Sequence, residues 1–341
     1  MAAVGPAAYK VWRGLIFPVR AMNVLFVTSN RIGDAVLSTG LLNHVIQTYP
    51  DARITLACGP EAAPLFAHAP NVVRVISLTK RKRAGHWFEL WRTCVVRVWD
   101  LVVDLRASAL AWLLIAKRRR LLRKSDAPVH RLRLLADVFG LDQIAPPRNW
   151  TSEEDLARAA ELVPQGGAIL AVGPTANWGG KQWPADSFAA LIARLTGPGG
   201  VLEGARVAIL GAAKEREAAA PVIASVPAER CVDLVGHVDL RTAAAVLARC
   251  RMYVGNDSGL MHLAAASKVP TLGLFGPSDE IHYGPWGEHT AFVRTPESFH
   301  QILHTPGYDF RSQRSLMTSL EVDTVAAAAE SLLRSSAGAA P

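Results

Sequence analysis

The sequence predicts an α/β fold of two Rossmann-like, doubly wound domains that face each other across a central cleft. The chain has 341 residues, about the length of two ordinary domains. Apolar segments of strand length alternate with helical patterns, which is typical of parallel β-α-β units. This alternation breaks once, near residues 145–155, and then begins again. Two consecutive α/β domains are the simplest arrangement with these properties.

The first domain is predicted over residues 22–150. Four short apolar runs predict strands at 23–28, 54–57, 72–78 and 101–105. Helical patterns follow at 35–48, 61–68 and 108–116. Residues 1–21 are expected to form an extension before the fold, because they contain one short apolar patch and no signal-peptide cleavage site.

The second domain is predicted over residues 151–320. It opens at Ser152, which is followed by three acidic residues, the pattern of a helix N-cap and first turn. Strands are expected at 168–172, 206–210, 252–254 and 271–275, and helices at 187–195, 215–224, 240–248 and 260–266. A last helix at 322–333 and a short tail make up residues 321–341. Open sheets of this kind bind ligands at the carboxyl ends of their strands, so the two domains are expected to share a cleft.

The composition excludes several classes of protein. Half of the residues are hydrophobic, which excludes a disordered or fibrous chain. The four cysteines are widely spaced and form no C-x-x-C pair, so the sequence predicts neither a disulfide framework nor a zinc cluster. No apolar stretch reaches the roughly 18–20 residues that span a bilayer. These features together predict a cytoplasmic protein.

Charge is distributed unevenly along the chain, whose formal net charge is +8. Residues 1–160 contain 23 Lys and Arg against 12 Asp and Glu, a net of +11, and residues 161–341 have a net of −3. Two basic runs, Lys80 to Arg83 and Lys117 to Arg120, concentrate this charge. The first domain is therefore expected to meet an anionic partner, although compositional drift would produce the same imbalance.

The sequence Arg31-Ile32-Gly33-Asp34 follows the first strand directly. A glycine in this position allows a tight turn, and the carboxylate of Asp34 would lie at the mouth of the sheet. Near a helix N-terminus Asp34 would either cap free amides or act as a general base that accepts a proton from an acceptor hydroxyl.

A glycine-rich loop with one lysine follows the first strand of the second domain, from Gly173 to Pro184. Backbone amides of such a loop, together with Lys181, would suit a phosphate group. The loop is not a Walker motif, because Gln182 stands where that motif requires Ser or Thr. A plain surface turn would have the same composition.

A third segment, Gly255 to Ala266, leads from a strand directly into a helix. Its first turn carries Asp257, Ser258 and Gly259, and free amides at this helix N-terminus would accept a diphosphate. Asp257 would alternatively accept hydrogen bonds from sugar hydroxyls. His262 lies one turn further, where it would face either the ligand or the core.

The sequence predicts no metal site. No two aspartates are separated by a single residue, so the Asp-x-Asp device that holds a metal beside a nucleotide-sugar is absent. His300 and His304 have the spacing of a metal pair, but no His-Glu-x-x-His pattern supports them. Lys181 and helix amides would then stabilise a leaving diphosphate.

Taken together, these blocks resemble glycosyltransferase family 9, the lipopolysaccharide heptosyltransferases. The opening motif ends at Asp34, and Trp99 to Leu105 is similar to the mid-domain strand of the family. Lys181-x-Trp183-Pro184 and the segment 255–266 are similar to its donor-half motifs. Residues 275–279 and 283–287 resemble its closing signature, whereas residues 294–320 match no block of the family.

The resemblance implies a GT-B architecture in which the first domain binds the acceptor and the second binds the donor. It also implies transfer of heptose from ADP-heptose to the inner core of lipopolysaccharide, with inversion and without a metal. ADP-heptose would be a substrate, and no cofactor is implied.

By position in the family motifs, Asp34 would be the general base and Lys181 the partner of the diphosphate. Asp257 would hold the sugar, and Ser258, Gly259 and His262 would line the diphosphate side. Glu215 would contact the ribose, with Glu217 as the alternative. Thr175 and Asn177 would be contacts from the glycine-rich loop.

The implied partners are the nucleotide-sugar donor and an anionic glycolipid acceptor, and no nucleic acid. The basic domain is expected to make peripheral contact with the cytoplasmic face of the inner membrane. Alternatives are a GT-B enzyme for another nucleotide-sugar, a nucleotide-sugar epimerase, and a non-enzymatic module that binds anionic glycolipid.

Overall fold

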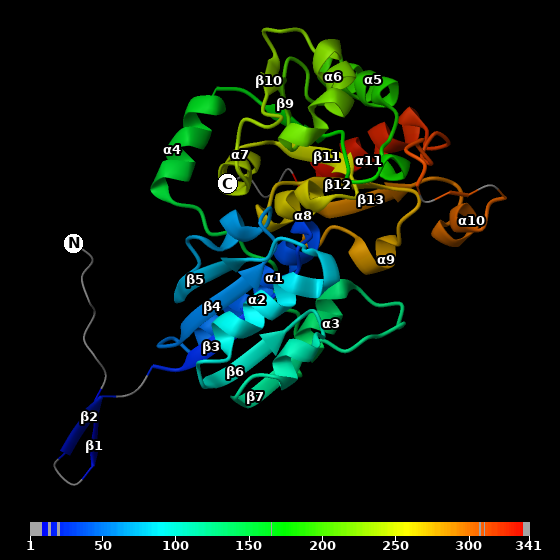
Figure 1. Ribbon diagram of the computed structural model, residues 1–341. Coiled ribbons are helices and arrows are strands. Elements are labelled where there is room, and N and C mark those ends of the chain that lie inside the picture. The colour runs from blue at the N-terminus through cyan, green and yellow to red at the C-terminus, as the bar shows by residue number, and fades with distance from the viewer. Residues whose placement is uncertain are drawn as a thin grey trace.

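The computed structural model describes residues 9–12, 15–18, 21–164, 166–306, 308–309 and 311–336. Two α/β halves lie one above the other, the first in blue to green and the second in green to red (Figure 1). Of the predicted N-terminal extension, β1 (Tyr9–Trp12) and β2 (Leu15–Pro18) form an antiparallel pair. Residues 1–8, 13–14, 19–20 and 337–341 of the predicted extension and tail lie outside the described residues.

The sheet of the first half is fully parallel, with the order β5-β4-β3-β6-β7. Its strands are β3 (Asn23–Val27), β4 (Arg53–Cys58), β5 (Val72–Ser77), β6 (Trp99–Asp104) and β7 (Ala116–Leu121). The chain order reverses between β3 and β6, and ligands of doubly wound sheets bind beside such a reversal. The residues that follow β3 therefore lie where a ligand is expected.

Helices cover both faces of this sheet, and the alternation of side chains along β3 decides which residues meet them. Val24 and Phe26 face α1 (Ile32–Thr48) and α3 (Arg131–Asp137), whereas Leu25 and Val27 face the opposite layer. That layer contains α2 (Gly85–Cys94) and the 3-10 turn η3 (Ala109–Trp112). Two further 3-10 turns are η1 (Ala63–Phe66) and η2 (Lys82–Ala84).

The helix predicted at 108–116 is wrong. The segment contains only the short η3, and the chain then turns into β7, which includes the basic run from Lys117 to Arg120. β7 pairs with β6 along one side only, and its charged side chains Lys117, Arg118 and Arg120 are exposed. The structure also has α2 and α3, which the sequence did not predict, and the predicted helix 61–68 is reduced to η1.

The sheet of the second half is also fully parallel, with the order β10-β9-β8-β11-β12-β13. Its strands are β8 (Ile169–Gly173), β9 (Arg206–Ile209), β10 (Cys231–Asp233), β11 (Met252–Asn256), β12 (Thr271–Phe275) and β13 (Thr290–Arg294). The four predicted strands are confirmed, and β10 and β13 are additional. Chain order reverses between β8 and β11, so the glycine-rich loop and the segment after β11 both border the reversal.

The helices of the second half include every predicted one. They are α4 (Glu153–Leu162), α5 (Ala185–Thr196), α6 (Arg216–Ser225), α7 (Leu240–Leu247), α8 (Gly259–Ala266), α9 (Glu280–Tyr283), α10 (Phe299–Leu303) and α11 (Val322–Ser335), with the 3-10 turns η4 (Gly179–Lys181) and η5 (Ala213–Glu215). Ser152 caps α4 in a capping box with Asp155, as its sequence predicts. No helix of the described residues is long and apolar enough to cross a membrane.

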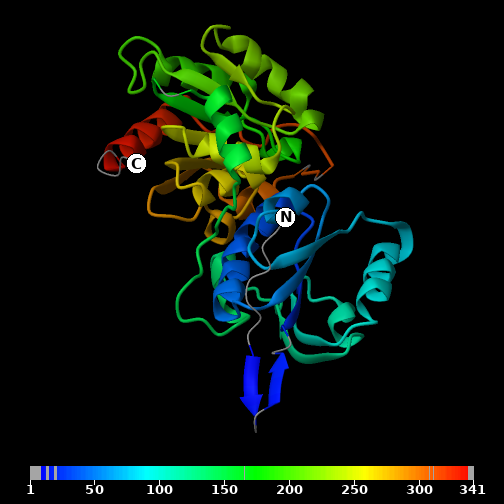
Figure 2. The same cartoon turned by 90° about the vertical axis from the view of Figure 1, so that its left-hand side faces the viewer.

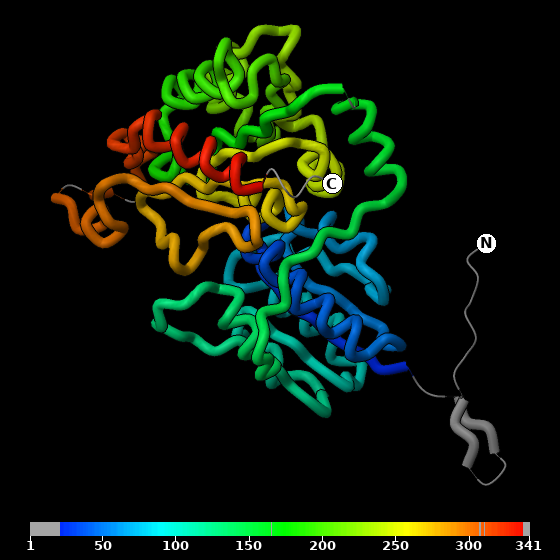
Figure 3. The backbone as a smooth tube through the Cα atoms, turned by 180° about the vertical axis from the view of Figure 1, so that it is seen from behind, coloured from blue at the N-terminus to red at the C-terminus, as the bar shows by residue number. Residues whose placement is uncertain are grey.

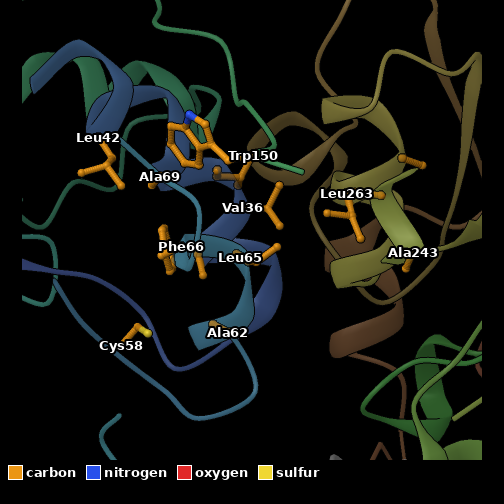
Figure 4. Close-up of a cluster of buried hydrophobic side chains, with 14 of the residues drawn as sticks. Val36, Leu42, Cys58, Ala62, Leu65, Phe66, Ala69, Trp150, Ala243 and Leu263 are labelled. Carbon is orange, nitrogen blue, oxygen red and sulfur yellow. The ribbon is translucent and has the colours of Figure 1, made fainter. Parts of the chain in front are cut away.

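One hydrophobic cluster continues from the first half into the second. It includes Val36 of α1 and Leu263 of α8, which Figure 4 shows opposite one another, together with Trp150 from the connection between the halves. Small residues allow this approach: a Cβ on Gly259 would lie 2.7 Å from Ile32 Cγ2, and a Cβ on Gly33 would lie 3.0 Å from His262 Cδ2. The first turns of α1 and α8 thus pack against each other, and Figure 2 shows the blue part of the first half beside the yellow and orange part of the second where the halves meet.

Gly33 does not serve the tight turn expected from the sequence. α1 begins at Ile32, earlier than the predicted residue 35, so that Gly33 and Asp34 belong to its first turn. Gly33 is absent from the described glycines with a positive φ. Its missing side chain is required instead by the close approach of His262.

Candidate active site

A cleft of about 1010 Å³ lies between the two halves and is lined by both. The first half contributes residues 30–34 and part of the segment 60–64. The second half contributes the glycine-rich loop, the segment 210–215 after β9, and the start of α8. All nine site residues predicted from the sequence line this cleft: Asp34, Thr175, Asn177, Lys181, Glu215, Asp257, Ser258, Gly259 and His262.

Asp34 reaches the cleft from the first turn of α1. Its carboxylate makes no capping hydrogen bond to the helix amides, which removes the capping alternative. Ser29 Oγ donates to Asp34 Oδ2 at 3.4 Å, and Arg131 Nε lies 3.6 Å from Oδ1. Asp34 Oδ1 is buried and has no hydrogen-bond partner within the described residues. This oxygen therefore has the capacity to accept a hydrogen bond from a ligand.

Arg131 is held beside Asp34 by the start of α3. His130 is the N-cap, and its Nδ1 accepts from the amide of Leu132 at 3.2 Å. The other ring nitrogen, Nε2, lies 2.9 Å from the carbonyl oxygen of Gly284 in the second half. Burial lowers the pKa of His130, so the neutral ring, which has one donor and one acceptor nitrogen, fits both contacts. The contact between the halves therefore fixes Arg131 as well.

Across the cleft, Lys181 and Asp257 form an ion pair. Lys181 Nζ lies 2.5 Å from Asp257 Oδ2, and the Asp257 side chain is almost fully buried. Lys181 comes from η4, after β8, and Asp257 comes directly after β11, the neighbouring strand. The ammonium group thus lies at the cleft, where Asp257 compensates part of its charge and an anionic ligand would interact with the rest.

The segment that the sequence could not place, 294–320, holds the loop of Lys181. Trp178 Nε1 donates to the carbonyl of Ser312 at 2.8 Å, and the amide of Gly179 donates to Gln313 Oε1 at 3.0 Å. The amide of Leu316 donates to the carbonyl of Gly180 at 3.1 Å. These contacts fasten the loop on the side away from the cleft, so the segment 311–316 positions Lys181.

Glu215 faces the cleft, whereas its alternative Glu217 is exposed and does not line it. Thr175 Oγ1 donates to Glu215 Oε2 at 3.0 Å, and the amide of Ala212 donates to the same oxygen at 2.9 Å. Asn177 lies exposed at the rim of the cleft. Among the predicted carboxylates of this segment, Glu215 alone is positioned to meet a ligand.

Ser258 and His262 present buried polar atoms near the start of α8. Ser258 Oγ and His262 Nδ1 are buried without a hydrogen-bond partner in the part of the chain that the structure describes. Burial lowers the pKa of His262 to about 4, although Asp257 and Asp34 each act to raise it. His262 is therefore neutral at pH 7, and its ring lies within range of Coulombic interaction with both carboxylates.

Comparison with known proteins gives the family. The family described as glycosyltransferase family 9 (heptosyltransferase) matches residues 103–304, more than half of the chain. This chain belongs to glycosyltransferase family 9. It is accordingly a glycosyltransferase, which sets aside the non-enzymatic alternative.

Relatives within glycosyltransferase family 9 match most of the chain. Lipopolysaccharide heptosyltransferase 2 of Salmonella typhimurium is 26% identical over 321 residues, covering 82% of this chain and 90% of the relative. Lipopolysaccharide heptosyltransferase 2 of Escherichia coli K12 is 25% identical over 325 residues, covering 82% and 90%. The match thus extends well beyond single motifs.

Solved structures show the same fold. A family 9 glycosyltransferase from Veillonella parvula has a TM-score of 0.76 at 22% identity and covers 92% of this chain and 98% of that one. The E. coli ADP-heptose lps heptosyltransferase II has a TM-score of 0.73 at 20% identity, covering 93% and 100%. The predicted GT-B architecture is confirmed.

Several residues that line the cleft had no role predicted from the sequence. Asn30, Trp178, Asp239 and Tyr283 also line it. Tyr283 belongs to the closing signature, and burial raises the pKa of its hydroxyl, as does Asp34 nearby. No sequence pattern pointed to Asp239, which the fold places at the cleft as the N-cap of α7.

Metal-ligating side chains do not gather in the described part of this family 9 chain, in which no group of three or more His, Cys, Asp or Glu would hold an ion. His300 and His304 lie on α10 and its C-terminal end, outside the cleft. The four cysteines are free, and Cys58, Cys94 and Cys250 are buried as expected for small hydrophobic side chains.

Proposed function

We propose that this chain transfers heptose from ADP-heptose to the inner core of lipopolysaccharide, with inversion and without a metal, and that Asp34 is the general base. Homologues named lipopolysaccharide heptosyltransferase support the substrate class. The observation that carries the proposal is the opposition, across one cleft, of an Asp34 oxygen without a hydrogen bond and the Lys181–Asp257 pair.

In the proposed reaction a hydroxyl oxygen of the acceptor attacks the anomeric carbon of the heptose. The bond between that carbon and the β-phosphate oxygen breaks, and ADP leaves with both bonding electrons. Asp34 Oδ1 accepts the hydroxyl proton, work that is usually worth about 10²–10⁴ in rate. Attack from the face opposite the leaving diphosphate inverts the anomeric centre.

Charge on the leaving diphosphate is proposed to be met by Lys181 and by the N-terminus of α8. Free amides at a helix N-terminus together with an ammonium group form an anion site that needs no divalent ion. When the diphosphate binds, the Lys181 ammonium group interacts with the phosphate oxygens as well as with Asp257. Asp257 is then free to accept hydrogen bonds from the heptose hydroxyls, and Ser258, Gly259 and neutral His262 line the diphosphate.

The nucleoside end of the donor is proposed to lie along Glu215, where a carboxylate held by Thr175 would accept from ribose hydroxyls. Asn177 at the rim would add a contact to the same ligand. The basic first half would take the anionic glycolipid acceptor at the cytoplasmic face of the inner membrane. The predicted boundaries, 22–150 for the acceptor part and 151–320 for the donor part, remain part of this proposal.

A donor screen tests the proposal. ADP-heptose is expected to raise the unfolding temperature more than other nucleotide-sugars, and to be consumed only when an acceptor is present. EDTA is expected to leave turnover unchanged. Preference for another nucleotide-sugar would replace the donor, consumption without acceptor would indicate an epimerase, and loss of turnover in EDTA would contradict metal independence.

A further inference from the structure

Large apolar side chains are exposed together on one side of the first half. Six of them lie between residues 88 and 115, with 41% to 80% of each side chain in solvent: Phe88, Val96, Val98, Trp112, Leu113 and Ile115. We refer to these six as the apolar patch. Exposed apolar groups scattered singly are ordinary, but a contiguous group marks an interaction surface.

Direct contacts join the segments that carry the patch. The rings of Phe88 and Trp91, one helical turn apart on α2, have centroids 5.6 Å apart. Trp91 Nε1 donates to the carbonyl of Leu113 at 3.2 Å, which joins α2 to the turn after η3. The amide of Trp99 donates to the carbonyl of Ile115 at 2.9 Å, which brings Ile115 beside Val98.

The turn that displays Trp112 and Leu113 is held rigidly from below. Arg119 donates to the carbonyls of Ala111, Leu114 and Ala116, at 2.7, 2.7 and 3.1 Å. Its guanidinium also lies 5.5 Å from the ring centroid of Trp112. One residue of the basic run therefore fixes the turn in a shape that exposes Trp112 and Leu113 and buries Leu110 and Leu114 on either side of them.

Basic side chains surround the patch. Arg92 and Arg97 are exposed within and just after α2, and Lys80, Lys82 and Arg83 precede it. None of these five forms an ion pair within the described residues. The acidic Glu89 of α2 is paired with Arg81, at 3.2 Å. The surface therefore combines exposed apolar groups with uncompensated positive charge.

We propose that this surface docks the enzyme on an anionic lipid bilayer, with the apolar patch inserted at the headgroup level. Aromatic and aliphatic side chains partition into that region, and arginine and lysine are attracted to anionic headgroups. A second copy of the chain is a poorer partner, because a two-fold contact through this surface would bring Arg92 and Arg97 of both copies together.

The surface also adjoins the cleft. Arg106 lies over the ring of Trp87, on α2, at 5.2 Å and donates to Asn30 Oδ1 at 2.9 Å, and Asn30 lines the cleft beside Asp34. Arg106 thus links α2, which carries part of the patch, to Asn30 at the cleft. The inference rests on the proposed function only in that an amphiphilic acceptor resides in such a bilayer.

Vesicle sedimentation of the full chain tests the proposal. Wild type is expected to bind vesicles of phosphatidylcholine mixed with phosphatidylglycerol more tightly than vesicles of phosphatidylcholine alone, and to dissociate as salt is added. Trp112→Ser/Leu113→Ser should weaken binding at least about tenfold, because both apolar side chains are lost from the interface. Arg92→Ser/Arg97→Ser should weaken it by about tenfold or more and flatten its salt dependence.

The matched control is Leu156→Ser/Val201→Ser, which removes two exposed apolar side chains from the second half. It should bind vesicles as wild type does. Equal binding by the control and by Trp112→Ser/Leu113→Ser, or no vesicle binding by wild type, would overturn the proposal. So would a wild-type dimer in ultracentrifugation that Trp112→Ser/Leu113→Ser converts to monomer.

Turnover of ADP-heptose with a delipidated, water-soluble acceptor separates this proposal from the proposed function. Trp112→Ser/Leu113→Ser and Arg92→Ser/Arg97→Ser should turn over the water-soluble acceptor as wild type does. Both should lose turnover only when the acceptor is embedded in anionic vesicles. Failure of wild type to turn over ADP-heptose would contradict the proposed function while leaving the vesicle result to stand by itself.

Discussion

Asp34 and His262 lie on either side of the contact between α1 and α8, yet burial acts on them differently. Asp34 keeps one oxygen without a hydrogen bond, with Arg131 beside it. His262 is sealed against Gly33, and burial holds its ring neutral. Each side chain thus has a separate measurable consequence.

The Asp34→Asn variant is expected to lose about 10²–10⁴ of turnover, because the amide cannot accept the acceptor proton. Donor affinity should change little, since the Lys181 loop and α8 remain intact. Steady-state kinetics with donor binding measured separately would check this. Asp186→Asn, an exposed aspartate in the first turn of α5, is the control and should behave as wild type. Full turnover in Asp34→Asn would refute the assignment of the base.

Acid is expected to destabilise the fold through His262. Its folded pKa is about 4, below the ordinary value of 6.5, so between these pH values the unfolded chain binds a proton that the folded chain does not. Stability should therefore fall as pH falls from 6.5 to 4, by about 3 kcal/mol from this group. Chemical denaturation at several pH values would show a flatter profile for His262→Asn, and parallel profiles would contradict the burial argument.

Elements that pack on two sides were predictable from the sequence, and elements at the edges were not. The strands β3, β8, β11 and β12 are nearly continuous apolar runs, because helices cover both faces of each sheet. β7 is an edge strand whose sequence, Ala-Lys-Arg-Arg-Arg-Leu, resembles a solvated helix face as much as a strand. Its identity comes from pairing with β6, which no local pattern encodes.

The same distinction applies to the cleft. Eight of the nine predicted residues follow strands at the two points of reversed chain order, and Glu215 follows the neighbouring strand β9. Their motifs and the fold rule therefore pointed to one place. The role of the segment 311–316 was hidden, because its contacts to the Lys181 loop join groups that are 134 residues apart in sequence.

The Gly179→Ala variant tests the element that positions Lys181. An added Cβ would lie 2.1 Å from the carbonyl oxygen of Gln313, so the loop or the segment 311–316 must move. We expect a stability loss of about 1–3 kcal/mol and a raised KM for the donor. Gly167→Ala is the control, because its Cβ would meet nothing within 4 Å. Unchanged donor KM in Gly179→Ala would contradict the positioning role.

At the scale of the whole molecule, the two halves are joined by more than their connecting chain. The shared hydrophobic cluster crosses from α1 to α8 and α7, and Trp150 packs into it (Figure 4). Figure 3 shows the green connection that runs from the first half to the second. Additional polar contacts join the rims: Lys214 Nζ lies 2.7 Å from Glu61 Oε1, and His282 Nδ1 lies 3.0 Å from the carbonyl oxygen of Val129.

Thermal unfolding is therefore expected to be a single cooperative transition, because neither half keeps its buried surface when the other unfolds. Differential scanning calorimetry should give one peak with equal calorimetric and van't Hoff enthalpies. ADP, although it binds mainly to the second half in the proposed function, should shift the entire peak upward. Two peaks, of which ADP moves one, would contradict this coupling.

The contact between the N-termini of α1 and α8 also bears on how the two halves can tilt relative to each other. Asp34 is the neighbour of Gly33, and Asp257 lies two residues before Gly259, so both carboxylates are close to the point where the halves touch. If that point is the pivot of any tilting between the halves, displacement grows with distance from it. The rim pairs would then separate widely, to admit or release a nucleotide, while the two carboxylates keep nearly the same spacing. One rotation would thus open the rim for ligand exchange and leave the spacing of the catalytic groups almost unchanged.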